Sequence, residues 1–324
     1  MIQLGNITLT PPVLLAPMAG ITDLPFRQLV ASFGAGLVVS EMVASQEMVQ
    51  AKPGVRERAE LGFGEAATSV QIAGRDAYWM GEAARMVEGN GARIIDINMG
   101  CPAKKVTGGL SGSALMKTPD HAMKLIEAVV AAVKIPVTLK MRLGWDDDCL
   151  NAPEIAKSAE AAGIQMITVH GRTRCQFYKG RADWAAISRV NEATSLPVIA
   201  NGDIRSSSDA KTALKLSGAD GVMVGRGAEG APWRLAEIAH ELGWGAAPVI
   251  PTGDDFTRMV MDHYEASLRF YGEVLGAKVI RKHLGWYMNH ADTPTELRRS
   301  ILTGTPAEVR LRLPEALNAC EAAA

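Results

Sequence analysis

Cys101 is the residue in this chain whose type and setting point most directly to chemistry. It lies in the segment Asp-Ile-Asn-Met-Gly-Cys-Pro at residues 96–102, after a buried-looking strand over residues 93–98. Glycine lets the backbone turn and proline ends a strand, so we expect Cys101 on a loop at a strand's carboxyl end, where a thiol is placed to react. The alternative is a small apolar loop residue, because free cysteines usually pack as small hydrophobes.

The elements that must position this cysteine are short apolar runs, each followed by Gly, Pro or polar residues and then by an alanine-rich, helix-like segment. Eight such runs occur, at residues 13–16, 37–40, 68–72, 94–98, 137–141, 166–170, 198–201 and 221–225. Continuous apolar strands that alternate with amphipathic helices indicate a parallel sheet covered on both faces. Eight of them in about 220 residues predict an α/β fold of the (β/α)8 TIM barrel type, with a doubly wound sheet as the alternative.

The carboxyl ends of these runs are polar, and a TIM barrel places its active site at that end of its strands. Each polar residue has a structural explanation when taken alone, as a wall ion pair, a core histidine or a cap. Together they predict a ligand pocket, because a concave site lined by a few polar groups is the usual binding site. The residues at these ends are Pro17, Met18, Ala19, Gly20, Glu41, Gln71, Asn98, Cys101, Lys140, Arg142, His170, Arg172, Asn201, Gly202, Asp203, Gly225 and Arg226.

The last two strand ends indicate a phosphate site. Asn201-Gly202-Asp203 leads into a serine run at residues 206–208 that is typical of a helix cap, while residues 225–228 (Gly-Arg-Gly-Ala) offer open backbone amides and a guanidinium. Barrels often hold phosphate in the loops after strands 7 and 8. The glycine-rich stretch at residues 108–113 lacks the Gly-Lys-Ser/Thr ending of a P-loop, so we interpret it as a mobile lid or a plain surface loop.

Composition limits the class of protein. The 324 residues are 48% hydrophobic and 21% charged, which suits one large core and a smaller appendage. No apolar run is long enough for a membrane helix and the first residues do not resemble a signal peptide, so we expect a cytoplasmic protein without membrane contact. The four cysteines form no Cys-x-x-Cys pair, so we expect reduced thiols and no metal site. A net charge of −1 gives no global sign of nucleic-acid binding, which would need a local basic patch.

A second, helical region follows the linker at residues 243–251. Helices are predicted at residues 255–271, 273–288, 295–302 and 307–323, which together indicate a small bundle. We therefore divide the chain into a barrel domain at residues 1–243 and a helical domain at residues 252–324. Basic residues concentrate in the middle of the bundle and are interpreted as phosphate contacts or as a solvated helix face. They are Lys278, Arg281, Lys282, His283, Arg298 and Arg299.

The chain resembles a known family, the tRNA-dihydrouridine synthases. The similarity lies in residues 16–23 (Ala-Pro-Met-Ala-Gly-Ile-Thr-Asp), 96–106 (Asp-Ile-Asn-Met-Gly-Cys-Pro-Ala-Lys-Lys-Val), 170–173 (His-Gly-Arg-Thr), 200–204 (Ala-Asn-Gly-Asp-Ile) and 281–287 (Arg-Lys-His-Leu-Gly-Trp-Tyr). These motifs extend over nearly the whole chain, and the second resembles the bacterial B branch. The resemblance implies reduction of the uracil C5=C6 bond in tRNA by FMN, with NADPH (or NADH) as reductant and with no obligate protein partner evident.

The resemblance also implies roles for individual residues. Cys101 would be the general acid that protonates C5 of uracil, although a nucleophilic thiolate stays open. Asn98 and Arg142 would face the uracil, and Arg172 would be a further substrate-binding residue. Lys278, Arg281 and Lys282 would contact tRNA. The residues that would bind FMN are Pro17, Met18, Ala19, Gln71, Lys140, His170, Asn201, Gly202, Asp203, Gly225 and Arg226.

Two other functions compete with this one. Another FMN barrel that reduces or oxidises a free pyrimidine would not need the helical region. A non-catalytic RNA-binding protein on an inherited barrel would be colourless when purified, because it would hold no flavin. The intact set of Gln71, Lys140, Asn201 and Arg226 argues against the second alternative.

Overall fold

The core of the molecule is a closed barrel of eight parallel strands. A computed structural model describes residues 1–51, 59–61 and 68–318 of the chain. The sheet order is β4-β3-β11-β10-β9-β8-β7-β6, and pairing of β4 with β6 closes it. The predicted TIM barrel is confirmed, and the doubly wound sheet is wrong. The barrel strands are β3 (Val13–Leu15), β4 (Leu37–Val39), β6 (Thr68–Ala73), β7 (Ile94–Met99), β8 (Val137–Arg142), β9 (Met166–His170), β10 (Val198–Asn201) and β11 (Gly221–Val224).

The register of the strands aligns polar side chains inside the barrel. Asp96 pairs with Gln71 on one side, and Asn98 pairs with Lys140 on the other. Arg142 pairs with His170. Because side chains alternate between the two faces of a strand, residues two apart share a face, so Asp96 and Asn98 point to the same side, as do Lys140 and Arg142. Apolar side chains of the same strands pack outward against the helices.

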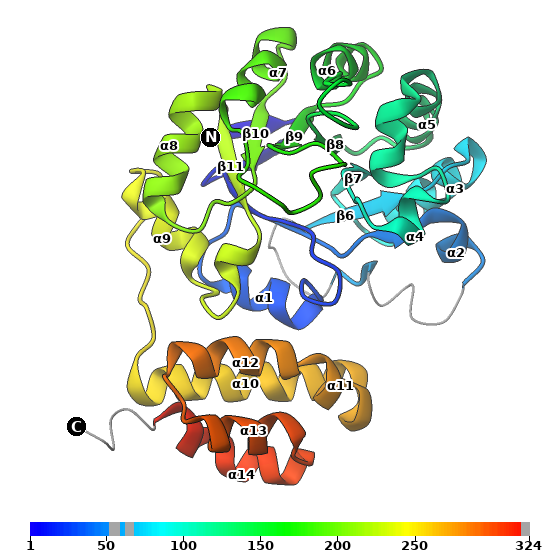
Figure 1. Cartoon of the computed structure of the whole chain (residues 1–324). Helices are drawn as coiled ribbons and strands as arrows, with labels where there is room; N and C mark the ends of the chain where they lie inside the picture. Colours follow the sequence, from blue (N-terminus) through cyan, green and yellow to red (C-terminus); the bar gives the residue numbers. More distant parts are fainter. Residues whose placement is uncertain (52–58, 62–67, 319–324) are drawn as a thin grey trace.

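Helices surround the strands, as Figure 1 shows. Two short strands that were not predicted, β1 (Ile2–Leu4) and β2 (Ile7–Leu9), form an antiparallel hairpin whose leucines pack against barrel residues such as Leu14 and Met166. A further short strand, β5 (Val43–Ala44), pairs with β6. The helices are α1 (Leu24–Ser32), α2 (Ser45–Val49), α3 (Ala77–Gly89), α4 (Lys104–Thr107), α5 (Pro119–Ala132), α6 (Ala152–Ala161), α7 (Ser188–Ala193), α8 (Ser207–Ser217) and α9 (Arg234–Glu241), with 3-10 turns η2 (Gly112–Lys117), η3 (Ala185–Ile187) and η4 (Arg226–Ala228).

The C-terminal region is a helical bundle with its own apolar core, which includes Tyr264, Leu284 and Leu313. Its helices are α10 (Gly253–Tyr271), α11 (Glu273–Val279), α12 (Arg281–His290), α13 (Thr295–Thr303) and α14 (Pro306–Leu317). The single helix predicted over residues 273–288 is divided at Ile280 into α11 and α12. The predicted end of the last helix, with Cys320, lies outside the described residues. None of the helices in the described ranges is long and apolar enough to cross a membrane.

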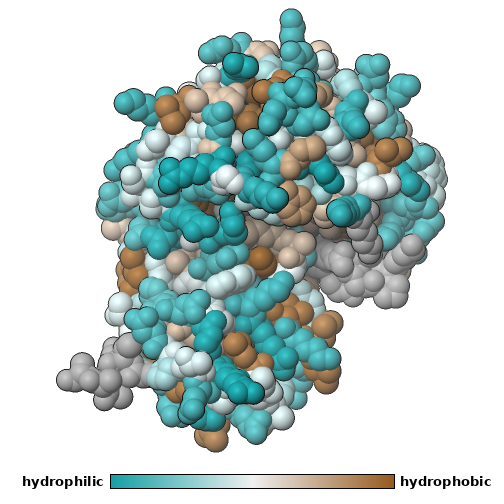
Figure 2. Space-filling model, in the orientation of Figure 1, coloured by the Kyte–Doolittle hydropathy of each residue, from teal (hydrophilic) through white to brown (hydrophobic). Residues whose placement is uncertain are grey.

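The bundle packs against the barrel through α1, below it in Figure 1. The His283 ring of α12 lies 4.5 Å from the Phe26 ring of α1, and its Nε2 is 3.2 Å from the carbonyl oxygen of Ile21. A Cβ added at Gly230 would lie 3.0 Å from the backbone of Trp286, so that loop touches α12 directly. Figure 2 shows a largely hydrophilic surface, with apolar residues in a hollow between barrel and bundle.

Asp23, at the start of α1, is buried in this contact. Its Oδ1 accepts a hydrogen bond from the Phe26 N–H, and its carboxyl group also forms a hydrogen bond with the Tyr271 side chain of α10. Burial, with a smaller contribution from Glu41, raises the pKa of Asp23 to about 6. A carboxyl group whose pKa is higher in the folded than in the unfolded state contributes stability that is lost as the pH rises from about 4 to about 6.

We therefore expect Asp23→Asn to change the pH dependence of stability. Asparagine keeps the oxygen that caps α1 but does not ionise. The free energy of unfolding of the variant, relative to the wild type, should rise by roughly 2–3 kcal/mol between pH 4 and pH 7. Urea unfolding at both pH values measures this difference. A difference in unfolding free energy that is the same at both pH values would contradict the raised pKa of Asp23. Asp255→Asn, at an exposed position on α10, is the matched control.

Candidate active site

A cavity of about 360 Å³ lies at the carboxyl ends of the barrel strands, within the usual size range of ligand sites. Most of the polar strand ends converge here as predicted, but Gly20, Glu41 and Arg172 do not line the cavity. Every residue that was expected to contact the flavin lines this cavity, and so do Asn98, Cys101 and Arg142. Those flavin residues are Pro17, Met18, Ala19, Gln71, Lys140, His170, Asn201, Gly202, Asp203, Gly225 and Arg226.

A chain of hydrogen bonds runs from a buried carboxyl group to the Cys101 loop. Gln71 Nε2 donates to Asp96 Oδ2 at 2.6 Å, and Asn98 Nδ2 donates to Gln71 Oε1 at 2.7 Å. Asn98 Oδ1 then accepts from the backbone N–H groups of Gly100 and Cys101, at 3.2 and 3.0 Å. The Cys101 thiol is thus held on a turn whose start is fixed by Asn98.

Lys140 brings a cation into the cavity wall. Its Nζ donates to Asn201 Oδ1 at 3.1 Å, and Asn201 Nδ2 donates to the Met223 carbonyl at 2.8 Å. Burial, and then repulsion by Arg142, lowers the pKa of Lys140 to about 8. The ammonium form therefore dominates at neutral pH. The same wall carries His170, whose pKa burial and four neighbouring cations hold well below its usual value, so its imidazole is neutral.

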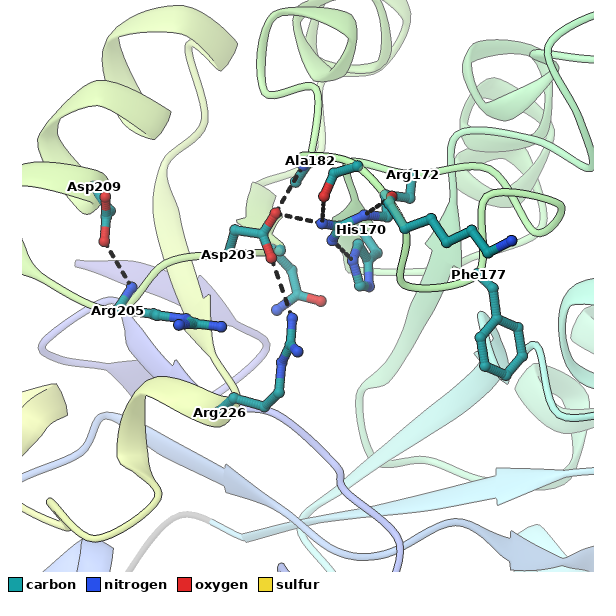
Figure 3. Close-up of polar contacts among 12 residues, drawn as sticks. His170, Arg172, Phe177, Ala182, Asp203, Arg205, Asp209 and Arg226 are labelled. Carbon is teal, nitrogen blue, oxygen red and sulfur yellow. Dashed lines mark hydrogen bonds and ion pairs between the residues drawn. The ribbon is translucent and has the colours of Figure 1, made fainter. Parts of the chain in front are cut away.

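Figure 3 shows Arg172, Arg205 and Arg226 around Asp203. The Asp203 carboxylate binds Arg172 Nη2 at 2.5 Å and Arg226 Nη2 at 3.3 Å, and also accepts from the Ala182 N–H at 2.8 Å. Arg205 lines the cavity nearby. At Gly227 an added Cβ would lie 2.8 Å from the Ile204 carbonyl, so the two loops approach as backbone. The first N–H groups of η4 have no acceptor within the turn, which makes this end suited to an anion.

The predicted helix cap is confirmed at Ser206. Its hydrogen bonds leave fewer backbone amides that could bind an anion. Ser206 and Asp209 form a capping box at the start of α8. Asp209 Oδ2 also accepts from the backbone N–H groups of Arg205 and Ser206, each at 3.0 Å. These amides are therefore used within the protein, so an anion here would meet η4, Arg226 and the Arg205 guanidinium.

Arg142 and Arg172, the two arginines that were expected to bind the substrate, donate most of their hydrogen bonds to backbone carbonyls. Arg142 donates from Nε to the Gly100 carbonyl at 2.7 Å and from Nη1 to the carbonyls of Thr173 and Phe177, both at 2.9 Å. Its Nη2 has no hydrogen-bond partner among the described residues. Arg172 does not line the cavity and lies behind His170, with its Nη1 3.2 Å from the imidazole Nε2.

The basic residues of the bundle do not lie together at the cavity. Lys282 reaches the barrel, since its Nζ would lie 3.3 Å from a Cβ at Gly20. Lys278 and Arg281 are exposed and do not line the cavity. His283 is buried, and burial lowers its pKa to about 4, so it cannot be the exposed phosphate contact that the sequence suggested.

The structure also adds residues that the strand ends did not indicate. Met42, Tyr178, Arg205 and Glu229 line the cavity from loops, and loop residues carry no periodic signal in a sequence. Among the described residues no group of three or more His, Cys, Asp or Glu side chains could hold a metal ion.

The glycine-rich stretch after Cys101 packs more tightly than a mobile lid or a plain surface loop would. Gly112 begins the turn η2 with φ +59°, and an added Cβ would lie 2.9 Å from the Cys101 carbonyl oxygen. Ser113 is fully buried and donates to that oxygen from both N and Oγ, at 3.1 and 2.8 Å. Gly112 and Ser113 therefore pack against the Cys101 turn and hold its carbonyl oxygen in place.

Comparisons with known proteins agree with this geometry. The family model "Dihydrouridine synthase (Dus)" matches residues 14–322. A probable tRNA-dihydrouridine synthase of Rhodobacter capsulatus is 63% identical, over 96% of each chain, and tRNA-dihydrouridine synthase B of Vibrio vulnificus is 46% identical, over 92% of this chain and 93% of its own. A solved complex of 2-naphthoyl-CoA reductase shares the fold, with a TM-score of 0.59 and 14% identity over 74% of this chain and 51% of that one. The chain therefore belongs to the dihydrouridine synthase family.

Proposed function

We propose that this protein is an FMN-dependent tRNA-dihydrouridine synthase, which reduces the C5=C6 bond of uridines in tRNA with NADPH or NADH as the source of electrons. The observation that supports this most is the cavity in which Cys101, Asn98, Lys140 and the anion-binding loops meet. The relatives at 63% and 46% identity are named as a probable tRNA-dihydrouridine synthase and as tRNA-dihydrouridine synthase B, which supports the tRNA-dihydrouridine part of the proposal.

The residues present fit FMN. The loop after β11 would offer the Arg226 guanidinium and the first amides of η4 to a phosphate, and the loop after β10 would add the Arg205 guanidinium. Lys140 would offer a cation to an electron-rich ring. Gln71 and Asn201 add amide groups at the wall, while Met18 and Met223 add apolar surface. A pocket with mostly apolar walls and a few convergent polar groups suits a flat heteroaromatic ring with a charged tail.

The chain's own residues would handle the uracil and the proton. When bound, FMN would supply the hydride that reduction of the uracil needs. The Cys101 thiol then gives its proton to C5, and the thiolate is reprotonated from solvent, so one hydride and one proton are added in total. Lys140 would stabilise negative charge that develops in the cavity, and Asn98 would orient the base.

A uridine in folded RNA must leave its stack to enter this cavity, at a cost of a few kcal/mol. We assign residues 1–243 as the catalytic domain and residues 252–324 as a tRNA-binding domain. Lys282 lies beside Gly20, in the loop after β3 that lines the cavity, and would be the bundle cation that contacts an entering nucleotide. Lys278 and Arg281 are exposed and would contact phosphates farther from the cavity.

The test is reduction of unmodified tRNA by the purified full-length protein with FMN and NADPH, followed by mapping of dihydrouridine. We expect dihydrouridine at specific positions of the tRNA and none in free uridine under the same conditions. Reduction of free uracil derivatives at rates equal to those on tRNA would favour a free-pyrimidine enzyme. A purified protein that binds no flavin would overturn the proposal.

One prediction concerns the anion end of the cavity. Arg226→Ala should weaken FMN binding roughly tenfold, because it removes a partly exposed charged donor from the proposed phosphate site. Titration of the apoprotein with FMN, followed by flavin fluorescence, measures the dissociation constant. Lys211→Ala, on the outer surface of α8, is the control and should bind FMN like the wild type. Equal affinity in both variants would show that the phosphate does not sit at Arg226.

A further inference from the structure

The loop after β9, residues 173–181 and here called the β9 loop, has no role in the proposed chemistry yet reaches the cavity. Tyr178 lines the cavity, and the Phe177 ring stands 4.8 Å from the Tyr178 ring in an edge-on contact. Both rings are exposed, Phe177 by 41% and Tyr178 by 52%. In Figure 3 the Phe177 ring points away from the cluster of Arg172, Asp203 and Arg226. An apolar ring is therefore presented to solvent one side chain away from the cavity.

The β9 loop is held in place by two buried arginines. Arg142 donates to the carbonyls of Thr173 and Phe177, as described above, and Arg172 donates to the carbonyls of Lys179 and Gly180 at 3.0 and 2.8 Å. Charged donors on buried side chains make strong hydrogen bonds, so this is an anchored loop. The anchoring also holds Phe177 at φ +57°, which a bulky side chain rarely adopts. The exposed ring is thus kept in a strained position at the cavity's edge, where strain commonly marks a functional site.

The charges of the β9 loop favour one kind of partner. Between residues 173 and 181 the chain carries Arg174, Lys179 and Arg181 and no acidic residue, although the loop contacts the acidic residue Asp147, whose Oδ1 accepts from Gln176 Nε2 at 3.4 Å. Lys179 and Arg181 are exposed, while Arg174 covers the Trp145 ring at 4.8 Å. Exposed aromatic rings among cations are the pattern by which proteins hold single-stranded nucleic acid, with bases stacked on rings and phosphates near cations.

The β9 loop also lies apart from the bundle. Gly20, which Lys282 approaches, follows β3, and β11 and β10 stand between β3 and β9 in the sheet. An RNA held by the bundle alone would be fixed on one side of the cavity. Extrusion of a uridine leaves the neighbouring bases without a stacking partner, so an aromatic surface on the second side would offset part of the extrusion cost.

We propose that the β9 loop is a second RNA-contact surface, in which the Phe177 ring stacks on a nucleobase beside the extruded uridine and Lys179 and Arg181 contact backbone phosphates. This rests on the proposed function, since it assumes an RNA substrate. Arg142 and Arg172 are then positioning residues that act through the loop.

The experiment measures binding of unmodified tRNA to the FMN-loaded, full-length protein at fixed salt. Phe177→Ala should raise the dissociation constant roughly 5- to 150-fold, the range expected for one lost base–aromatic stack, whereas Phe177→Tyr should stay within about twofold of the wild type. Leu216→Ala, which removes an exposed apolar side chain of α8, is the matched control and should bind tRNA normally. The visible absorbance of bound FMN reports that each variant is folded.

A second arm tests the charges. The double variant Lys179→Ala/Arg181→Ala should reduce the slope of log affinity against log salt by about 1 to 2, the contribution of two phosphate contacts. A Phe177→Ala protein that binds tRNA within twofold of the wild type, a Phe177→Tyr protein as weak as Phe177→Ala, or an unchanged salt slope would each overturn the proposal. Failure of the proposed function is distinguishable, because then the wild type itself forms no dihydrouridine.

Discussion

Cys101→Ala is expected to lower the rate of dihydrouridine formation by about 10²- to 10⁴-fold, the usual contribution of a general acid. The thiol lines the cavity and is the proposed proton donor to C5 of the uracil. The measurement is dihydrouridine in tRNA from cells that lack the protein, complemented with either the wild type or the variant. Single-turnover reduction of tRNA by the purified variant gives the rate.

Cys149→Ala is the matched control, since Cys149 is a partly buried free cysteine that does not line the cavity. It should restore dihydrouridine fully. Cys101→Ser should stay well below the wild type, because a hydroxyl is a much weaker acid than a thiol. Full restoration by Cys101→Ala would remove Cys101 from the chemistry.

Lys140→Met should slow uracil reduction by about 10²- to 10³-fold, the cost of removing one preorganised charged donor from an active site. Methionine fills much of the same volume, so the barrel core should be retained, while the Nζ contact with Asn201 Oδ1 at 3.1 Å is lost. Rates of tRNA reduction at saturating NADPH measure the effect. A variant within a few-fold of the wild type would show that this cation is not needed.

The pKa of Lys140 gives this prediction a second readout. With a pKa of about 8, the ammonium group of the apoprotein is lost as the pH rises through 8, and with it the attraction for an electron-rich ligand. FMN affinity of the wild type should therefore fall between pH 7.5 and 9.5. Lys140→Met should bind FMN more weakly and with little change over the same range. An identical pH profile in both proteins would contradict the role of Lys140.

The sequence was sufficient to predict where the site would be, because strand ends carry a strong pattern. Lys140 lies near the end of one apolar run and Asn201 ends another, and the closed barrel brings Lys140 Nζ to 3.1 Å from Asn201 Oδ1. What each side chain binds was harder to predict. Arg142 and Arg172 also follow strands, yet most of their N–H groups bond carbonyls of a loop whose path depends on the whole fold. Phe177 and Met42 were missed because a loop has no periodicity.

The bundle illustrates a different limit. Helical periodicity predicted its helices, but the cluster of basic residues in α12 gave no information about which side faces the barrel. His283 and Lys282 are neighbours in sequence, yet one is buried against Phe26 and the other reaches Gly20. That distinction depends on how the bundle packs on α1, which follows from tertiary contacts rather than from local composition.

The hydrogen-bond chain that starts at Asp96 has a consequence for the choice between bases. Burial raises the pKa of Asp96, and its two oxygens accept from Gln71 Nε2 and Thr138 Oγ1. Gln71 therefore turns its oxygen toward Asn98, and the Asn98 nitrogen points to Gln71. The Asn98 oxygen is used by two backbone amides, which leaves one N–H of its side chain for the cavity. We expect that hydrogen to favour a ring carbonyl oxygen over an amino group, which separates uracil from cytosine at C4 but not at C2, where both bases carry a carbonyl. Asp96, which does not line the cavity, thereby fixes the direction in which the Asn98 amide faces the pocket.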